Sequence, residues 1–124
     1  MATVLTDAGR ALLTARIKGL GSEPKYVAWG TGAGTAAKGD TALFVESADE
    51  ARVAGISTQE TGAVSQDTYQ VVGTLTVQTS PKTITNAGLF DAAVGGNLFI
   101  KGDFTGIPLN IGDSIQFTIK WQVL

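Results

Sequence analysis

The side chains that could carry chemistry in this chain are few, because its 124 residues include neither cysteine nor histidine. Without them there is no thiolate nucleophile, no imidazole base and no zinc ligand of the usual kind. Serine and threonine are plentiful, but no histidine can activate them and nothing marks a Ser–Lys pair. We therefore expect no enzyme activity, no catalytic residue and no cofactor.

Carboxylates form two candidate sets. Glu46, Asp49 and Glu50 are close in sequence and could act together as general acid and base. The second set could supply oxygen ligands to calcium and consists of Asp91, Asp103 and Asp113. The D-x-[DN]-x-[DN]-G pattern of a calcium loop is absent, and turn-forming Gly or Asn residues are near. We interpret the second set as turn caps and predict no metal site, with weak calcium binding as the alternative.

A glycine-rich segment follows a predicted strand, which is where a phosphate-binding turn would lie. It begins Gly30-Thr31-Gly32-Ala33-Gly34 and continues to Gly39. Neither the G-x-G-x-x-G nor the G-x-x-x-x-G-K-[ST] spacing is present, and no helix pattern follows directly. We interpret the segment as a long flexible loop.

Aromatic residues suggest a third kind of chemistry, the stacking of rings on a sugar or a base. Tyr26 and Trp29 lie in one short predicted strand, which would place them on opposite faces. Trp121 belongs to an alternating apolar row and is predicted to pack in the core. A carbohydrate-binding β-sandwich that uses Tyr26 and Trp29 remains an alternative, of a different class from a structural protein.

One helix, over residues 5–18, is predicted near the N-terminus. Its apolar face has spacings of three and four residues and consists of Leu5, Ala8, Leu12 and Ala15. Thr6 is a suitable N-cap and Gly19 a suitable C-cap. Gly9 weakens the helix by about 1 kcal/mol relative to alanine, so the helix needs to pack against the rest of the domain.

Alternating apolar and polar residues predict antiparallel strands over about residues 25–124. The predicted strands are residues 26–29, 53–58, 69–78, 83–90, 98–104 and 114–123, and residues 41–52 stay unassigned. Gly95-Gly96-Asn97 supplies the positive φ angles of a hairpin turn. We predict one all-β domain over 1–124, an antiparallel sandwich or small barrel, with a jelly roll among the options.

Composition limits the partners. A net charge of −2 and a pI near 4.9 argue against a nucleic-acid or anionic-membrane surface. No apolar stretch is long enough to span a membrane, and we expect synthesis in the host cytoplasm. Only 16% of the residues are charged, where about 25% is usual, which suggests that other subunits cover part of the surface.

Apolar residues in predicted loops are the candidate contacts. Residues 105–112 carry three aliphatic side chains, which either fold under the sheet or dock onto a partner. Residues 43–45 raise the same question, and the glycine-rich loop adds two exposed polar candidates. The candidate interface residues are Leu43, Phe44, Ile107, Leu109, Ile111, Thr31 and Thr35.

Short motifs follow one another in order along nearly the whole chain. They are LTDAGRALL at 5–13, YVAWGTG at 26–32, DTAL at 40–43 with Glu46 and Arg52, ITNAGLFDA at 84–92, GNL at 96–98 and DSIQFTI at 113–119. Their succession resembles bacteriophage virion proteins, best known from the N-terminal region of tail-collar and tail-fibre proteins and from small capsid and tail structural proteins.

This resemblance implies a virion structural protein with no reaction to perform. The chain ends directly after its last strand, and Asn86 stands where the fibre pattern has an acidic residue. A head decoration (cement) protein is therefore the expected role, binding the major capsid protein or another virion protein on the capsid surface as a homotrimer. A tail, baseplate or fibre-attachment protein is the alternative.

Overall fold

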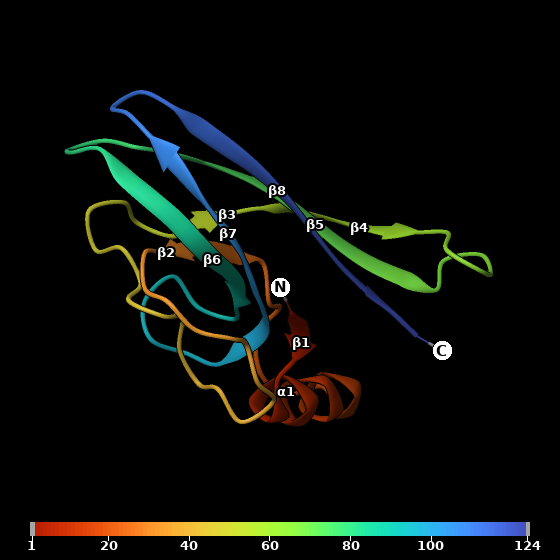
Figure 1. Cartoon of the computed structure of the whole chain (residues 1–124). Helices are drawn as coiled ribbons and strands as arrows, with labels where there is room; N and C mark the ends of the chain where they lie inside the picture. The colour runs from red at the N-terminus through yellow and green to blue at the C-terminus, as the bar shows by residue number, and fades with distance from the viewer. Residues whose placement is uncertain (1, 124) are drawn as a thin grey trace.

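The structure is a computed structural model that describes residues 2–123. Its elements in chain order are β1 (Thr3–Leu5), α1 (Asp7–Lys18), β2 (Tyr26–Gly30), β3 (Val53–Ala54), β4 (Ile56–Glu60), β5 (Thr68–Thr76), β6 (Lys82–Phe90), β7 (Leu98–Leu109) and β8 (Ser114–Gln122). They form two antiparallel sheets, with the helix at one end of the larger (Figure 1). The prediction of an all-β sandwich with one short helix is confirmed.

The helix α1 begins and ends where its caps require. The Thr6 hydroxyl accepts a hydrogen bond from the Gly9 backbone N–H, and Gly19 ends the helix in the left-handed conformation. Leu5, expected in the helix, lies in β1 and pairs with Ile100. Gly9 lies so close to β7 that a Cβ atom there would collide with the carbonyl oxygen of Phe99. The glycine that weakens the helix is therefore the residue that lets it pack.

The large sheet has the strand order β1-β7-β6-β2-β3. Its centre is the β6–β7 hairpin, whose turn has Gly95 and Gly96 at positive φ, as predicted. Strand β7 extends to Leu109, so most of the loop expected over 105–112 continues the strand paired with β6. Register shifts interrupt the pairing between β6 and β7, between Ile84 and Asn86 and between Leu89 and Phe90.

The small sheet has the order β4-β5-β8. The strand expected over residues 53–58 is divided at Gly55, because Val53–Ala54 pairs with β2 in one sheet and Ile56–Glu60 with β5 in the other. The chain therefore passes from one layer to the other at this point (Figure 1). The alternation in β5 is confirmed, since its inward residues Val71 and Leu75 are buried.

The core lies between the two sheets. It contains Val27, Trp29, Leu89 and Phe99 from the large sheet and Val71 and Leu75 from the small one. The rings of Trp29 and Phe117 meet edge to face across the layers at 6.4 Å, as do those of Phe99 and Trp121 at 6.3 Å. The apolar row of β8 faces this core as predicted, but its residues are only half-buried. Within residues 2–123, no helix is long and apolar enough to span a membrane.

Candidate interaction surface

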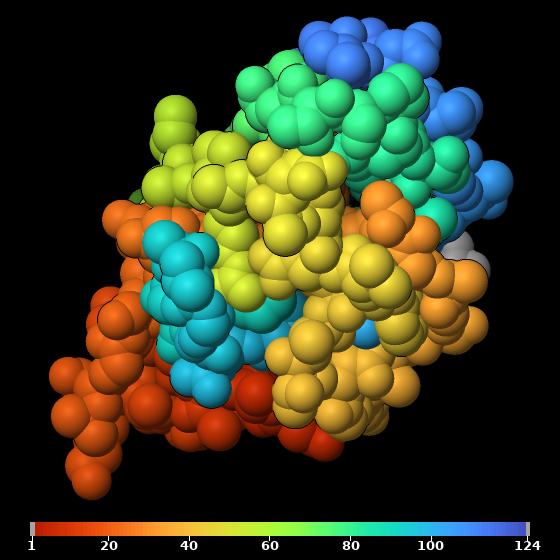
Figure 2. Space-filling view, turned by 90° about the vertical axis from the view of Figure 1, so that its left-hand side faces the viewer, coloured from red at the N-terminus to blue at the C-terminus, as the bar shows by residue number. Residues whose placement is uncertain are grey.

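Residues 31–52 connect β2 to β3 and cover one face of the large sheet; we call them the anchored loop. Figure 2 shows them in orange to yellow, beside the turn of residues 91–97 in cyan. The loop folds back on itself, with the Thr31 N–H donating to Val45 O at 3.0 Å and the Gly32 N–H to Phe44 O at 2.9 Å. The sequence predicts a flexible segment over residues 30–39 and leaves residues 41–52 unassigned, but polar side chains of the sheet bind the loop at several points.

Asn86, on β6, binds the backbone of the loop. Its side-chain oxygen accepts from the Phe44 N–H at 3.0 Å, and its amide nitrogen donates to the Phe44 carbonyl at 3.0 Å. The Asn86 side chain is fully buried, so its polar atoms depend on these protein partners in place of water. An ionised carboxylate accepts but cannot donate, which gives a physical reason for asparagine in place of the acidic residue of the fibre pattern.

Lys101, on β7, is a second anchor. Its side chain is 1% exposed, and its Nζ donates to Asp40 Oδ2 at 3.0 Å and to the Ala42 carbonyl at 2.8 Å. The ammonium also lies 3.3 Å from the centre of the Phe44 ring. Hydrogen bonds from the Ala37 backbone and from Lys101 hold the pKa of Asp40 below its ordinary value.

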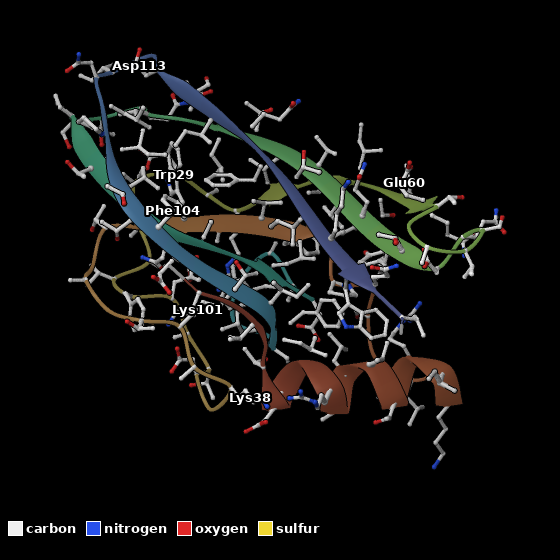
Figure 3. All side chains as sticks on the ribbon, turned by 45° about the vertical axis from the view of Figure 1, so that its right-hand side comes forward. Trp29, Lys38, Glu60, Lys101, Phe104 and Asp113 are labelled. Carbon is white, nitrogen blue, oxygen red and sulfur yellow. The ribbon has the colours of Figure 1, made fainter. Side chains whose placement is uncertain are left out.

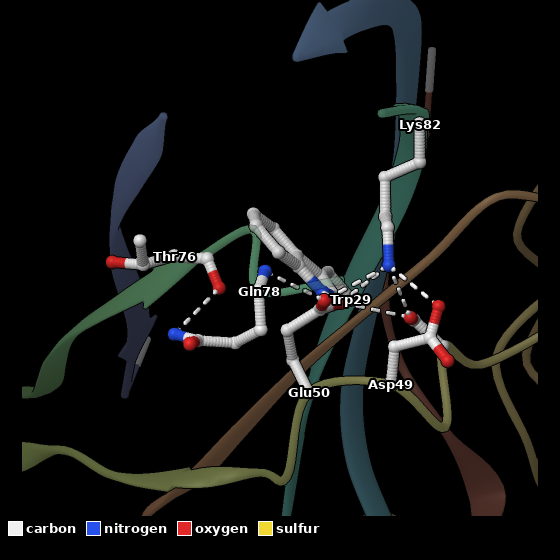
Figure 4. A network of polar contacts seen from close by, with 7 residues as sticks. Trp29, Asp49, Glu50, Thr76, Gln78 and Lys82 are labelled. Atoms are coloured by element: carbon white, nitrogen blue, oxygen red, sulfur yellow. Dashed lines mark hydrogen bonds and ion pairs between the residues drawn. The ribbon is translucent and has the colours of Figure 1, made fainter. Parts of the chain in front are cut away.

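Lys82, on β6, binds the end of the loop through a buried network (Figure 4). Its Nζ lies 2.8 and 2.9 Å from the two oxygens of Glu50 and 3.0 Å from Asp49 Oδ2. The Trp29 indole and the Gln78 backbone N–H donate to the same Glu50 carboxylate, each at 3.1 Å. Burial alone would raise the pKa of Glu50, but the hydrogen bonds from Lys82 and its neighbours outweigh it and lower this pKa.

Arg52 joins the loop to the neighbouring turn. Its guanidinium makes a two-pronged ion pair with Glu46 at 2.9 and 3.0 Å and lies 3.6 Å from the centre of the Phe90 ring. It also donates to the carbonyls of Ala92 and Gly95, at 2.9 and 2.6 Å. A hollow of about 540 Å³ lies between this part of the loop and the turn.

The aspartates predicted as turn caps divide into two groups. Asp91 accepts from the Asn97 N–H at 2.6 Å and Asp113 from the Asn110 N–H at 2.8 Å, as expected of turn caps. Asp103 is different: it is buried and accepts from the Ala36 N–H at 2.8 Å. That hydrogen bond is the main cause that lowers its pKa. The turn-cap interpretation of Asp103 was therefore wrong, and this carboxylate is a further anchor of the loop.

The carboxylates of the first set each bind a cation, Glu46 with Arg52, and Asp49 and Glu50 with Lys82. Across the described chain, no group of three or more acidic side chains could hold a metal ion, and no buried side-chain polar atom lacks a partner. This arrangement fixes the shape of a surface. The carboxylates of Glu46, Asp49 and Glu50 are already paired with cations that hold the loop in place.

The aromatic platform expected for carbohydrate binding does not form. Trp29 is 1% exposed and packs in the core, whereas Tyr26 packs with a separate cluster on the opposite face of β2. A sugar ring therefore cannot stack on both.

The candidate interface residues fall into a buried, a half-buried and an exposed group. Leu43 is buried against Ala28, Phe90 and Leu98, so it belongs to the monomer's interior and its side chain is not a surface contact. Phe44 and Leu109 are half-buried, Leu109 against the core. The exposed candidates are Thr31, Thr35, Ile107 and Ile111. Residues 107–111 lie at the end of the molecule away from the helix, apart from the anchored loop (Figures 1 and 2).

The anchoring cations were missed by sequence reasoning. A signal was present at Lys101, because a lysine that follows Leu98-Phe99-Ile100 interrupts a run of apolar residues in a central strand. An exposed apolar residue of the surface was missed as well, because Val94 is 89% exposed. Val45, in the segment 43–45 that the sequence indicated as a possible contact, is 68% exposed. Val45 also has a φ of 50°, a left-handed conformation that a β-branched residue rarely adopts.

The comparison with protein families matches most of the chain. The model described as "Gp80: Podophage GP4 fiber I protein gp80" matches residues 21–122. The matched part contains both sheets except β1, together with the anchored loop, and leaves α1 outside. No curated protein and no solved structure matches the chain.

Proposed function

Since the chain belongs to the family of the podophage GP4 fiber I protein gp80, and is thus a phage virion structural protein related to fibres, we propose that it is a tail-fibre component that holds virion proteins together. The observation that carries this proposal is the family match over residues 21–122. The match favours the tail over the head surface, where the sequence alone led us to expect a decoration protein. The partners are other virion proteins, and the work is binding without catalysis.

The anchored loop is the surface we assign to this binding. An irregular segment that is already ordered loses little conformational freedom when it docks, so more of the contact energy appears as affinity. Buried anchors from β6 and β7 provide this order: Asn86, Lys101 and Lys82. The strained backbone at Val45 supports the same role, because unusual backbone conformations concentrate where function requires them.

The location is tested on purified particles. Mass spectrometry with copy-number calibration is combined with electron microscopy of particles in which this protein carries a label. We expect few copies per particle and label on the tail. Label spread over the head at high copy number, or absence of the protein from the particles, would overturn the tail-fibre proposal.

The assignment of the surface is tested by a matched pair of variants. Val45→Asp places a charge on the loop, and aspartate tolerates the left-handed backbone better than valine, so folding is preserved. Ile17→Asp makes the same chemical change at an 81% exposed residue of α1, outside the family match. We expect Val45→Asp to reduce incorporation into particles at least tenfold and Ile17→Asp to leave it unchanged. Equal incorporation of both variants would exclude the loop as the contact.

A further inference from the structure

Strand β8 is the longest edge strand of the two sheets. The other edge strands in the described chain are β1, β3 and β4, with three, two and five residues, whereas β8 has nine. On one side β8 pairs with β5 through nine successive residue pairs without a register shift. On the other side no strand within residues 2–123 pairs with it, although β7 precedes it directly. In Figure 3, β8 runs away from the turn at Asp113 and diverges from β7, the strand that carries Phe104.

The residues of β8 alternate between the bound side and the open side. The Asp113 carbonyl accepts from the Val77 N–H at 2.9 Å, and the Val123 N–H donates to the Asp67 carbonyl at 2.9 Å. Because bonded and non-bonded pairs alternate in an antiparallel ladder, the odd-numbered residues between these points bond to β5. The even-numbered residues present their backbone N–H and C=O groups to the open edge: Ser114, Gln116, Thr118, Lys120 and Gln122.

This edge lacks the features that usually prevent strand pairing. Edge strands are commonly blocked by proline, bulges, several charges or shortness. The other edge strands, β1, β3 and β4, are protected by their shortness. Strand β8 has no proline, no bulge and one charged residue, Lys120.

We propose that β8 is a self-association surface, where the β8 strands of two copies of this chain pair antiparallel across a twofold axis at Thr118. In this arrangement each even-numbered residue of one copy faces an even-numbered residue of the other. Only such pairs can exchange hydrogen bonds, because the even-numbered residues present their backbone N–H and C=O groups to the open edge. The midpoint of Ser114–Gln122 is Thr118, so this register alone uses all nine residues.

The strand's own side chains fit this register. On the core-facing side, Phe117 of one copy lies opposite Ile119 of the other, and Ile115 opposite Trp121; aromatic and β-branched residues make favourable cross-strand pairs. On the outer side Thr118 of one copy faces Thr118 of the other, and threonine pairs are also favourable. A second copy is therefore the occupant that this edge fits, since faces and hydrogen bonds match without further adjustment.

Charge favours the same register. Lys120 of one copy lies opposite Gln116 of the other, so the two lysines are four residues apart along the ladder, roughly 13 Å at the usual rise per residue. That separation exceeds the screening length of about 10 Å at 0.1 M salt. Moving the axis to residue 120 would place the two ammonium groups directly opposite each other.

A hollow beside the edge gives the association an apolar component. It has a volume of about 220 Å³ and is lined by Phe104, Phe117 and Ile119, among others. The row that lines it is half-buried in one copy. Pairing through β8 brings the Phe117 and Ile119 side chains of the second copy next to this row, where they remove more apolar surface from water.

The first test measures the mass of the full chain in solution by sedimentation over a dilution series. We expect a species of two chains that dissociates on dilution. Thr118→Pro removes an N–H group from the centre of the open edge and leaves the ladder with β5 intact, so it gives one chain. Thr118→Lys keeps that N–H but places like charges opposite each other, and it also gives one chain. If the proline variant does not fold, the lysine variant decides.

The matched control lies on the other edge of the same sheet. By the same alternation, Gln59 of β4 points its backbone to the open side, and its side chain is exposed. Gln59→Pro therefore makes the same change at an edge the proposal leaves unpaired, and it keeps the two-chain mass.

A cross-link tests the register directly. The chain has no cysteine, so Thr118→Cys introduces a lone thiol that lies opposite itself only if the axis is at residue 118. Facing Cα atoms of a bonded pair are about 5.5 Å apart, within reach of a disulfide. We expect mild oxidation to link two Thr118→Cys chains and to leave Gln59→Cys unlinked.

Three results overturn the inference: one chain at every concentration, a three-chain species as expected from the family resemblance, or a two-chain species that survives both substitutions at Thr118. The inference does not depend on where the protein lies in the particle. Its failure would leave the tail-fibre proposal standing.

Discussion

The anchored loop and strand β8 differ in the kind of contact that holds each of them. The loop has no regular structure, but buried side chains such as Asn86 and Lys101 bind its backbone and its carboxylates. Strand β8 has regular hydrogen bonds along its length, but the apolar row on its inner face is half-buried and its outer edge is open. In this molecule, therefore, the segment with the more regular sequence pattern is not the segment with the more buried contacts.

The difference has an energetic consequence. A buried ion pair adds little net stability when it replaces an apolar contact, but removing one partner leaves a charge that is neither solvated nor paired. A half-buried apolar residue loses only part of its transfer free energy when it is truncated. Substitutions at the anchors should therefore destabilise the protein more than substitutions in β8.

The largest loss of stability is expected when Lys82 is replaced. Lys82→Met leaves the carboxylate of Glu50, whose side chain is 3% exposed, without its cation, and we expect a loss of about 3–5 kcal/mol in the free energy of unfolding. Lys38→Met is the matched control, because Lys38 is an exposed lysine of the anchored loop that Lys82 binds, and it should change stability by less than about 0.5 kcal/mol. Urea unfolding measures both. Similar values for the two variants would contradict the buried network.

The same network makes stability depend on pH. Folding lowers the pKa of Glu50 below its ordinary value of 4.5, so its contribution is present above pH 4.5 and lost as the pH falls through the lowered pKa. Folding raises the pKa of Lys82 above 10.5, despite burial, through Glu50 and Asp49, so that contribution is lost as the pH rises through the raised pKa. In Lys82→Met we expect the alkaline loss to diminish. Urea unfolding at several pH values measures this, and an unchanged alkaline profile would argue against the pairing.

A somewhat smaller effect is expected at Asn86. Asn86→Asp keeps the shape, but the ionised carboxylate cannot donate to the Phe44 carbonyl, and the charge is buried, so we expect a loss of about 2–4 kcal/mol at neutral pH. Burial raises the pKa of the new carboxyl in the folded state. Its stability penalty therefore grows as the pH rises above the unfolded pKa, and part of the loss is recovered in acid. Thermal unfolding at pH 4 and pH 7 measures this, and a variant that weakens on acidification relative to the parent would refute the assignment.

Periodicity in the sequence predicted the elements that repeat a local pattern. The helix caps Thr6 and Gly19, the alternation in β5 and the Gly95-Gly96 turn are confirmed, because each depends on residues close together in the chain. The division at Gly55 and the extension of β7 were not predicted, because they depend on which strand lies alongside.

The anchors escaped prediction for a similar reason. Lys101 binds Asp40, 61 residues away, and Asn86 binds Phe44, 42 residues away, so no local pattern links the partners. Glycine content indicated backbone freedom in the loop, which is a property of the segment in isolation. The contacts that remove this freedom are supplied by the sheet.

A moderate effect is expected where the helix meets the large sheet. Gly9→Ala is a stabilising change in an exposed helix, but here the added methyl group collides with the Phe99 carbonyl. We expect a loss of about 2–3 kcal/mol, since α1 has to move away from β7 and Leu12 leaves its buried position. Urea unfolding tests the prediction. A gain in stability would show that the helix adjusts freely, as a helix held only by its own hydrogen bonds would.

The smallest effects are expected on β8. Phe117→Ala removes a ring that meets Trp29 edge to face but is half-buried, so we expect a loss of about 1–2 kcal/mol, below the 3–5 kcal/mol of a fully buried phenylalanine. Thr118→Ala, on the exposed face, should cost less than about 0.5 kcal/mol. These values refer to dilute protein, because at concentrations where two copies pair through β8 both residues would lie at the interface. A cost of Phe117→Ala that rises with protein concentration in urea unfolding would therefore link the half-buried row to self-association, whereas a cost that stays constant would assign the row to the monomer alone.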